Sequence, residues 1–145
     1  MKIFAFAAPL AAVAVLACGA AGAAEPNNTV PDDQTVTING IDIACTGVGD
    51  EARSDPRWRD YPVRIEFAGG EAQYLSDLDI SIFDSKGQSI LEVSCNSPWL
   101  LAALPPGKYT VRGTFENLTK TAKFTAPATG QARVIVRFPE IVGND

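Results

Sequence analysis

Histidine is absent from all 145 residues of this chain. Because histidine is the most frequent general base and the commonest metal ligand, neither a Ser-His-Asp nor a Cys-His catalytic set can be assembled. A structural zinc site needs four ligands, and the cysteines do not complete that set. The sequence therefore predicts a protein that is not an enzyme and that uses no cofactor or metal.

Carboxylates are the remaining source of catalytic groups. Asp50 and Glu51 are adjacent, so their side chains diverge, whereas Asp77 and Asp79 would share one face of a strand. We interpret the second pair as part of a solvated strand face, and no loop with the Asp/Asn/Gly spacing of a calcium site is present. A carboxylate-dependent hydrolase is kept as an alternative function.

Positive charge is also scarce. The chain has 12 Lys and Arg against 17 Asp and Glu, which gives a net charge of −5. No basic patch is evident that would neutralise nucleic-acid phosphates or bind an anionic membrane surface. After residue 24 no apolar run is long enough to span a bilayer. We therefore expect neither a nucleic-acid partner nor a transmembrane segment.

The first 24 residues predict an export signal. Lys2 supplies the positive charge, residues 3–18 are apolar apart from one proline, and small residues allow cleavage near Ala23/Ala24. We expect a periplasmic or secreted mature protein. The run Val-Leu-Ala-Cys-Gly around Cys18 is weakly similar to a lipoprotein box, so a lipid anchor on Cys18 is the alternative.

The remainder has the length of one domain. Residues 25–34 lack a period and have few apolar groups, which is typical of a flexible tether, and residues 140–145 form a polar tail. Between them, residues 35–139 carry the strand pattern. Cys45 and Cys95 lie in this domain, and an even cysteine count in an exported protein predicts a disulfide; two reduced, buried thiols are the alternative.

Alternating apolar and polar residues predict short strands throughout the domain. The clearest prediction is a hairpin with Asn39-Gly40 as its two-residue turn, so that Ile38 faces Ile41 and Val36 faces Ile43. No segment has a convincing period of 3.6. About seven to nine short strands with regular turn signals are typical of an all-β sandwich.

The longest connection, from Thr46 to Tyr61, is the candidate binding region, because long loops in compact domains are often functional. A short helical turn with Asp50 as its N-cap is expected in it. Trp58 and Tyr61 could stack a sugar or a peptide; alternatively, Trp58 packs beneath its own loop with an arginine over the ring. Trp99 lies in an apolar run and is expected in the core. The candidate binding surface consists of Asp50, Glu51, Arg57, Trp58, Arg59 and Tyr61.

A tight turn precedes the strand at 108–115. Its signature residues are Leu104, Pro105, Pro106, Gly107 and Tyr109, in the run Leu-Pro-Pro-Gly-Lys-Tyr-Thr-Val. This run resembles the signature of carboxypeptidase regulatory-like domains, which are seven-stranded, transthyretin-like (prealbumin-like) sandwiches, and the resemblance covers about residues 62–138. It implies that fold and no particular activity. Related hydroxyisourate hydrolases depend on histidines, so their activity is not implied.

The mature chain also resembles small exported proteobacterial proteins of this family, through Asn39-Gly40, the stretch 47–51 and the stretch 98–101. These observations together lead us to expect a non-catalytic exported module that binds a protein or an envelope component. The alternative is a carbohydrate or peptidoglycan-fragment binder that uses Trp58 and Tyr61.

Overall fold

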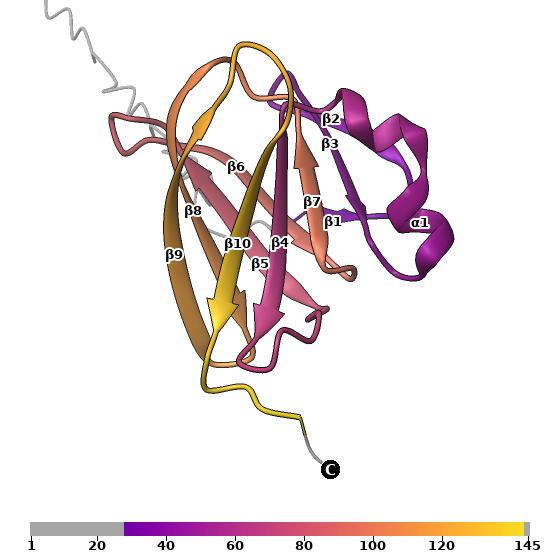
Figure 1. The fold of residues 1–145 in the computed structure, drawn as a ribbon. Helices are drawn as coiled ribbons and strands as arrows, with labels where there is room; N and C mark the ends of the chain where they lie inside the picture. The colour runs from indigo at the N-terminus through magenta and orange to yellow at the C-terminus, as the bar shows by residue number, and fades with distance from the viewer. Residues whose placement is uncertain (1–27, 144–145) are drawn as a thin grey trace, which may run out of the picture.

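The computed structural model describes residues 28–143, which form two β-sheets packed face to face (Figure 1). Ten strands are present together with two short helices, α1 and η1. The strands are β1 (Asn28–Val30), β2 (Thr35–Ile38), β3 (Ile41–Thr46), β4 (Val63–Gly69), β5 (Leu78–Phe83), β6 (Ser89–Cys95), β7 (Trp99–Ala102), β8 (Gly107–Phe115), β9 (Leu118–Ala126) and β10 (Ala132–Phe138). The α-helix α1 spans Asp50–Ser54 and the 3₁₀ helix η1 spans Pro56–Asp60.

The two sheets have five strands each. Sheet A has the order β1-β6-β5-β8-β9, and sheet B has the order β10-β4-β7-β3-β2. Among the pairings of these strands, only β1–β6 and β10–β4 are parallel, and each lies at one edge of its sheet. The predicted all-β sandwich is thus confirmed.

The predicted hairpin is present with its predicted register. Ile38 pairs with Ile41 and Val36 with Ile43. Asn39 and Gly40 both have positive φ angles, 53° and 76°, as a primed two-residue turn requires.

The core lies between the sheets and is built from alternate residues of the facing strands. Its largest fully buried members include Phe67, Phe138, Ile43, Ile65, Leu78, Ile80, Ile82, Leu91 and Leu100. The sheets approach closely at Gly113 on β8, where an added Cβ would lie 2.6 Å from the Phe67 ring. Glycine is required here because any larger side chain would overlap that ring.

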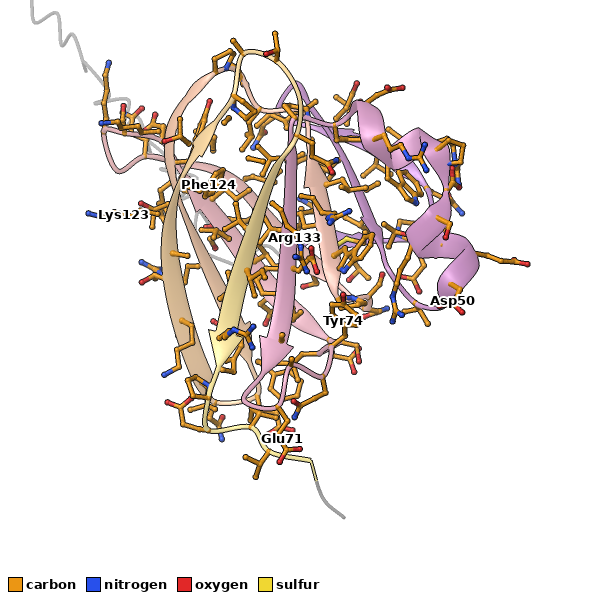
Figure 2. The ribbon with its side chains drawn as sticks, in the orientation of Figure 1. Asp50, Glu71, Tyr74, Lys123, Phe124 and Arg133 are labelled. Carbon is orange, nitrogen blue, oxygen red and sulfur yellow. A yellow bond between two sulfur atoms is a disulfide. The ribbon has the colours of Figure 1, made fainter. Side chains whose placement is uncertain are left out.

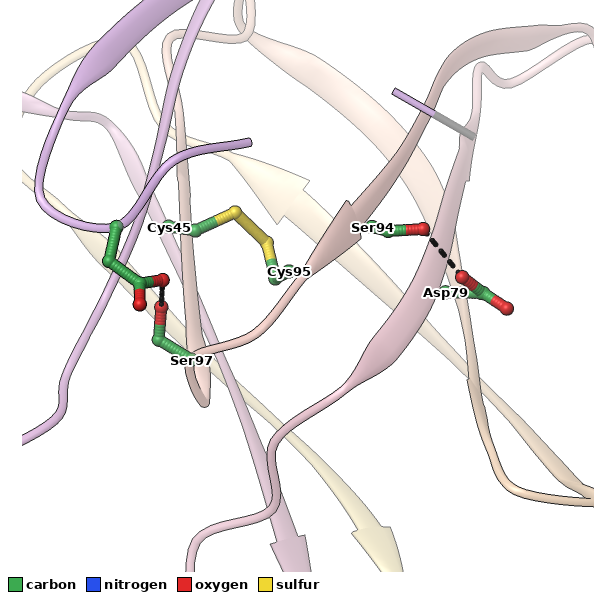
Figure 3. Close-up of a disulfide and its surroundings, with 6 residues drawn as sticks. Cys45, Asp79, Ser94, Cys95 and Ser97 are labelled. Atoms are coloured by element: carbon green, nitrogen blue, oxygen red, sulfur yellow. Dashed lines mark hydrogen bonds between the residues drawn. A yellow bond between two sulfur atoms is a disulfide. The ribbon is translucent and has the colours of Figure 1, made fainter. Parts of the chain in front are cut away.

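The predicted disulfide is confirmed: Cys45 on β3 and Cys95 on β6 are bonded, with their Cα atoms 5.6 Å apart (Figure 3). Both cysteines are fully buried. Because β3 belongs to sheet B and β6 to sheet A, the bridge joins the two sheets covalently across the core.

Residues 28–34 differ from the predicted flexible tether. Val30 on β1 is 1% exposed and packs in the core, and the backbone N–H of Asp33 donates to the carbonyl of Cys45 over 2.9 Å. Asp32 Oδ1 accepts a hydrogen bond from the Ser97 hydroxyl at 2.6 Å, next to the disulfide (Figure 3). The Asp33 carboxylate also accepts a hydrogen bond from the Thr46 hydroxyl at 2.5 Å. The prediction failed because a single buried valine and two carboxylates hold this segment, and such a pattern has no period.

The predicted signal peptide, with Cys18, and residues 25–27 of the tether lie outside the described residues. Within residues 28–143, no helix is long and apolar enough to cross a membrane.

Candidate binding surfaces

The segment with α1 and η1 packs against the outer face of sheet B, beside β2 and β3 (Figure 1). Trp58 on η1 is 3% exposed and contacts Ala44 and Leu101. The Arg57 guanidinium carbon lies 4.5 Å from the centroid of the Trp58 ring. The Gln131 side chain donates a hydrogen bond to the carbonyl of Trp58 at 2.7 Å, and this contact also fixes the segment.

This burial decides between the two interpretations of Trp58. A sugar that stacks on an aromatic ring needs an open ring face, and Trp58 has none. Trp58 therefore packs beneath its own loop with an arginine over the ring. The alternative of a carbohydrate site at Trp58 and Tyr61 is wrong, because the Trp58 ring is not open to a ligand. Tyr61 is half-buried against the same cluster, and its hydroxyl lies 2.9 Å from that of Thr35.

The charged candidates lie at the surface of this segment. Asp50 and Glu51 are exposed in the first turn of α1, and Figure 2 shows Asp50 at the outer end of the helix. Gly49, not Asp50, is the N-cap, and it makes no side-chain cap. Asp55 caps η1, because its carboxylate accepts from the backbone N–H of Arg57 at 2.9 Å and from its Nη2 at 2.7 Å. These hydrogen bonds lower the pKa of Asp55.

The exposed charged residues do not form one open site around Trp58, whose ring is covered by Arg57. Arg57 is paired with Asp55, and Arg59 is exposed without a described hydrogen bond or ion pair. Of the alternative carboxylate pair, Asp77 has a positive φ of 59°, which breaks the strand alternation that would place it beside Asp79. Asp77 precedes β5, whereas Asp79 on β5 accepts a hydrogen bond from the Ser94 hydroxyl at 2.6 Å (Figure 3).

A buried carboxylate lies on the outer face of sheet B. Glu66 is 1% exposed. Its Oε1 accepts from Arg133 Nη2 at 3.0 Å and from the Tyr74 hydroxyl at 3.2 Å, and its Oε2 accepts from Arg64 Nε at 3.1 Å and from Arg133 Nε. Figure 2 shows Arg133 and Tyr74 on this side of the sandwich.

The arginines determine the ionisation of Glu66. Burial alone would raise its pKa, but the hydrogen bond from Arg133 and the charges of Arg64 and Arg133 outweigh burial, so the pKa of Glu66 is lowered. The carboxylate therefore stays ionised at neutral pH with both oxygens occupied. Such a group is poorly suited to accept or donate a proton during a reaction.

Aromatic rings and arginines extend this cluster. The Arg64 guanidinium lies 4.4 Å from the Trp99 ring and the Arg53 guanidinium 4.6 Å from the Tyr74 ring, and Tyr74 meets Trp99 edge-on with centroids 6.2 Å apart. Trp99 is buried as predicted, but on the outer face of sheet B and not between the sheets. The cluster covers this part of the outer face of sheet B.

A shallow groove of about 600 Å³ lies on the opposite sheet. The turn at residues 84–87 forms one wall, and the first half of β8 with the second half of β9 forms the other. Lys108, Arg112 and Lys123 line it and are exposed. Figure 2 shows Lys123 pointing outward from β9, whereas Phe124 points toward the interior.

The three cations of this groove have no acidic partner. Within residues 28–143, no carboxylate oxygen lies within 4.0 Å of the Lys108, Arg112 or Lys123 nitrogens. Asp84 also lines the groove, but its Oδ1 accepts from the backbone N–H groups of Lys86 and Gln88, both at 2.9 Å. The groove is therefore positively charged in a chain whose net charge is −5.

We expected no basic patch in this chain, but the three cations of the groove form one. The alternation of β8 placed Lys108 and Arg112 on the polar face, but their proximity to Lys123 depends on the pairing of β8 with β9. The signature turn lies behind the groove: the Tyr109 hydroxyl donates to the Pro105 carbonyl at 2.6 Å, and the Tyr109 ring stacks on Phe124 with centroids 5.7 Å apart. This contact holds the start of β8 in place.

The chain was compared with protein-family models and with curated proteins. No protein-family model matches the chain, and no curated protein matches it. Within residues 28–143, no group of three or more acidic or cysteine side chains is arranged to hold a metal ion.

Proposed function

We propose that this protein is a non-catalytic, exported β-sandwich module that binds a protein or another component of the cell envelope through the groove over sheet A. The observation that carries the proposal is the group of three cations, Lys108, Arg112 and Lys123, that no carboxylate neutralises. Three exposed cations gathered on one face, with Asp84 as the one carboxylate among the lining residues, favour a partner with negative charge.

The transthyretin-like fold type is part of the proposal. The resemblance covers residues 62–138, and seven strands, β4 to β10, fall within that range. Export is supported by the predicted signal peptide and by the disulfide, which requires an oxidising compartment to persist. The ionised, fully hydrogen-bonded state of Glu66 supports the non-catalytic assignment.

Affinity capture from envelope extract tests the proposal. Three forms of the tagged mature protein are compared: the wild type, Lys108→Gln with Lys123→Gln, and Arg59→Gln with Arg137→Gln. The two double variants have the same net charge, and the second lacks only cations outside the groove. We expect an envelope component that is retained by the wild type and the second variant and lost from the first. Equal retention by all three, or none by any, would overturn the proposed function.

A further inference from the structure

We infer that the groove over sheet A binds an acidic oligosaccharide, a chain of sugar units that carry carboxylate groups. This inference rests on the proposed function and names the chemical class of its ligand. Three properties of the groove support it: the arrangement of its cations, its hydroxyl groups and the absence of an open apolar anchor.

The cations and hydroxyls are arranged in a repeated pattern along the β8–β9 ribbon. In the register of these strands Lys108 pairs with Thr125, Lys123 with Thr110, and Arg112 with Thr121. Each of the three pairs thus places one cation beside one threonine, and the cation changes strand from one pair to the next. Successive pairs are two residues apart, which is about 7 Å along a strand.

Each pair can make the two contacts that an acidic sugar unit offers. A lysine or arginine binds a carboxylate through a charge-assisted hydrogen bond, and arginine can do so with two parallel bonds. A threonine hydroxyl both donates and accepts, as the hydroxyl groups of a sugar do. Thr110 and Thr125 line the groove, and Thr121 lies beside it on β9. Because these three threonines have no described hydrogen bond from their side chains, their hydroxyls are available to a ligand.

The aromatic rings of the groove pack against neighbouring side chains and are only partly exposed, which disfavours a peptide. Peptides and proteins gain most of their affinity from large side chains that enter apolar pockets. Arg112 lies 4.7 Å over the Phe83 ring, and Tyr109 and Phe124 stack on each other. A ligand in this groove therefore meets charges and hydroxyls, and an acidic oligosaccharide satisfies both.

Isothermal titration of the full mature protein with oligogalacturonate tests the inference. Maltohexaose serves as the uncharged sugar and poly-L-glutamate as the acidic peptide. We expect oligogalacturonate to bind, maltohexaose not to bind, and poly-L-glutamate to bind at least tenfold more weakly than oligogalacturonate. Lys108→Gln with Lys123→Gln should weaken oligogalacturonate binding at least tenfold, and Arg59→Gln with Arg137→Gln by less than twofold. Equal melting temperatures of the variants exclude unfolding as the cause.

Two results would overturn the inference, and they differ in what they mean for the proposed function. If poly-L-glutamate binds as tightly as oligogalacturonate and Lys108→Gln with Lys123→Gln weakens both, the groove is a binding surface whose ligand is not a sugar. If oligogalacturonate does not bind, or binds equally to both double variants, the acidic-sugar site is wrong. The proposed function then depends on the envelope capture alone.

Discussion

Arg133 on β10 donates hydrogen bonds to both carboxylate oxygens of Glu66 on β4. This two-point contact links the outermost strand of sheet B to its neighbour through side chains, in addition to their parallel backbone pairing. It also keeps a 1% exposed carboxylate ionised. Two predictions follow from this pair of residues.

Replacing Arg133 by methionine should lower the free energy of unfolding by about 1–3 kcal/mol, because Glu66 would stay buried with fewer donors. Arg64 and Tyr74 remain, which keeps the loss below that of a fully isolated charge. Urea denaturation measures the effect. Arg137→Met on the same strand is the matched control, since Arg137 is exposed and has no described ion pair, and it should change stability by less than about 0.5 kcal/mol. Equal effects of the two substitutions would contradict the prediction.

The stability contributed by Glu66 should depend on pH. Its pKa is lower in the folded protein than the ordinary value of 4.5, so the folded state favours the ionised form. The contribution is fully present above the unfolded pKa and is lost as the pH falls through the folded pKa. The difference in unfolding free energy between the wild type and Glu66→Gln should therefore be largest at pH 7 and shrink as the pH falls below the ordinary value of 4.5. A difference that stays constant over this range would show that the charge of Glu66 does not contribute.

Removing the disulfide with Cys45→Ala and Cys95→Ala should lower the free energy of unfolding by about 2–5 kcal/mol, the range for native bridges in small secreted domains. Chemical denaturation of the mature protein measures this loss. Thiol titration of the unfolded, unreduced protein, expressed without residues 1–24 and so without Cys18, should find no free thiol. Two free thiols per chain would rule out the bridge in solution.

Gly113→Ala should destabilise the sandwich by about 1–3 kcal/mol, because the new methyl group would lie 2.6 Å from the Phe67 ring between the sheets. Thermal or urea unfolding measures it. Thr121→Ala on the neighbouring strand β9, whose side chain is exposed, is the control and should have a much smaller effect. If both substitutions are neutral, the sheets can separate at Gly113 without cost.

Local patterns predicted much of this fold from the sequence. The Asn39-Gly40 hairpin was predictable because turn type and register depend on only a few adjacent residues. The Cys45–Cys95 bridge was predictable because an even cysteine count in an exported protein indicates pairing. By contrast, β1 was missed, since three residues with a single apolar side chain give no alternation to detect.

The surfaces were harder to predict because they depend on contacts distant in the chain. Glu66 occupies a polar position in an alternating strand, which ordinarily indicates exposure to solvent. It is buried because Arg133, 67 residues away, and the side chains of Arg64 and Tyr74 contact it and cover it. Trp58 and its neighbours were chosen for their composition, but composition does not distinguish an aromatic ring that binds a ligand from one that anchors its own loop. The groove required the register of β8 against β9, which alternation alone does not specify.

The bridge between the sheets also has a mechanical consequence. A pulling force applied at the two ends of the chain passes from Cys45 directly to Cys95 through the covalent bond, bypassing the residues between them. The enclosed loop, with α1, η1, β4 and β5, cannot be drawn out while the bond is intact. Only the segments outside the bridge can extend, so under tension the molecule should lengthen by a limited distance and then resist further extension.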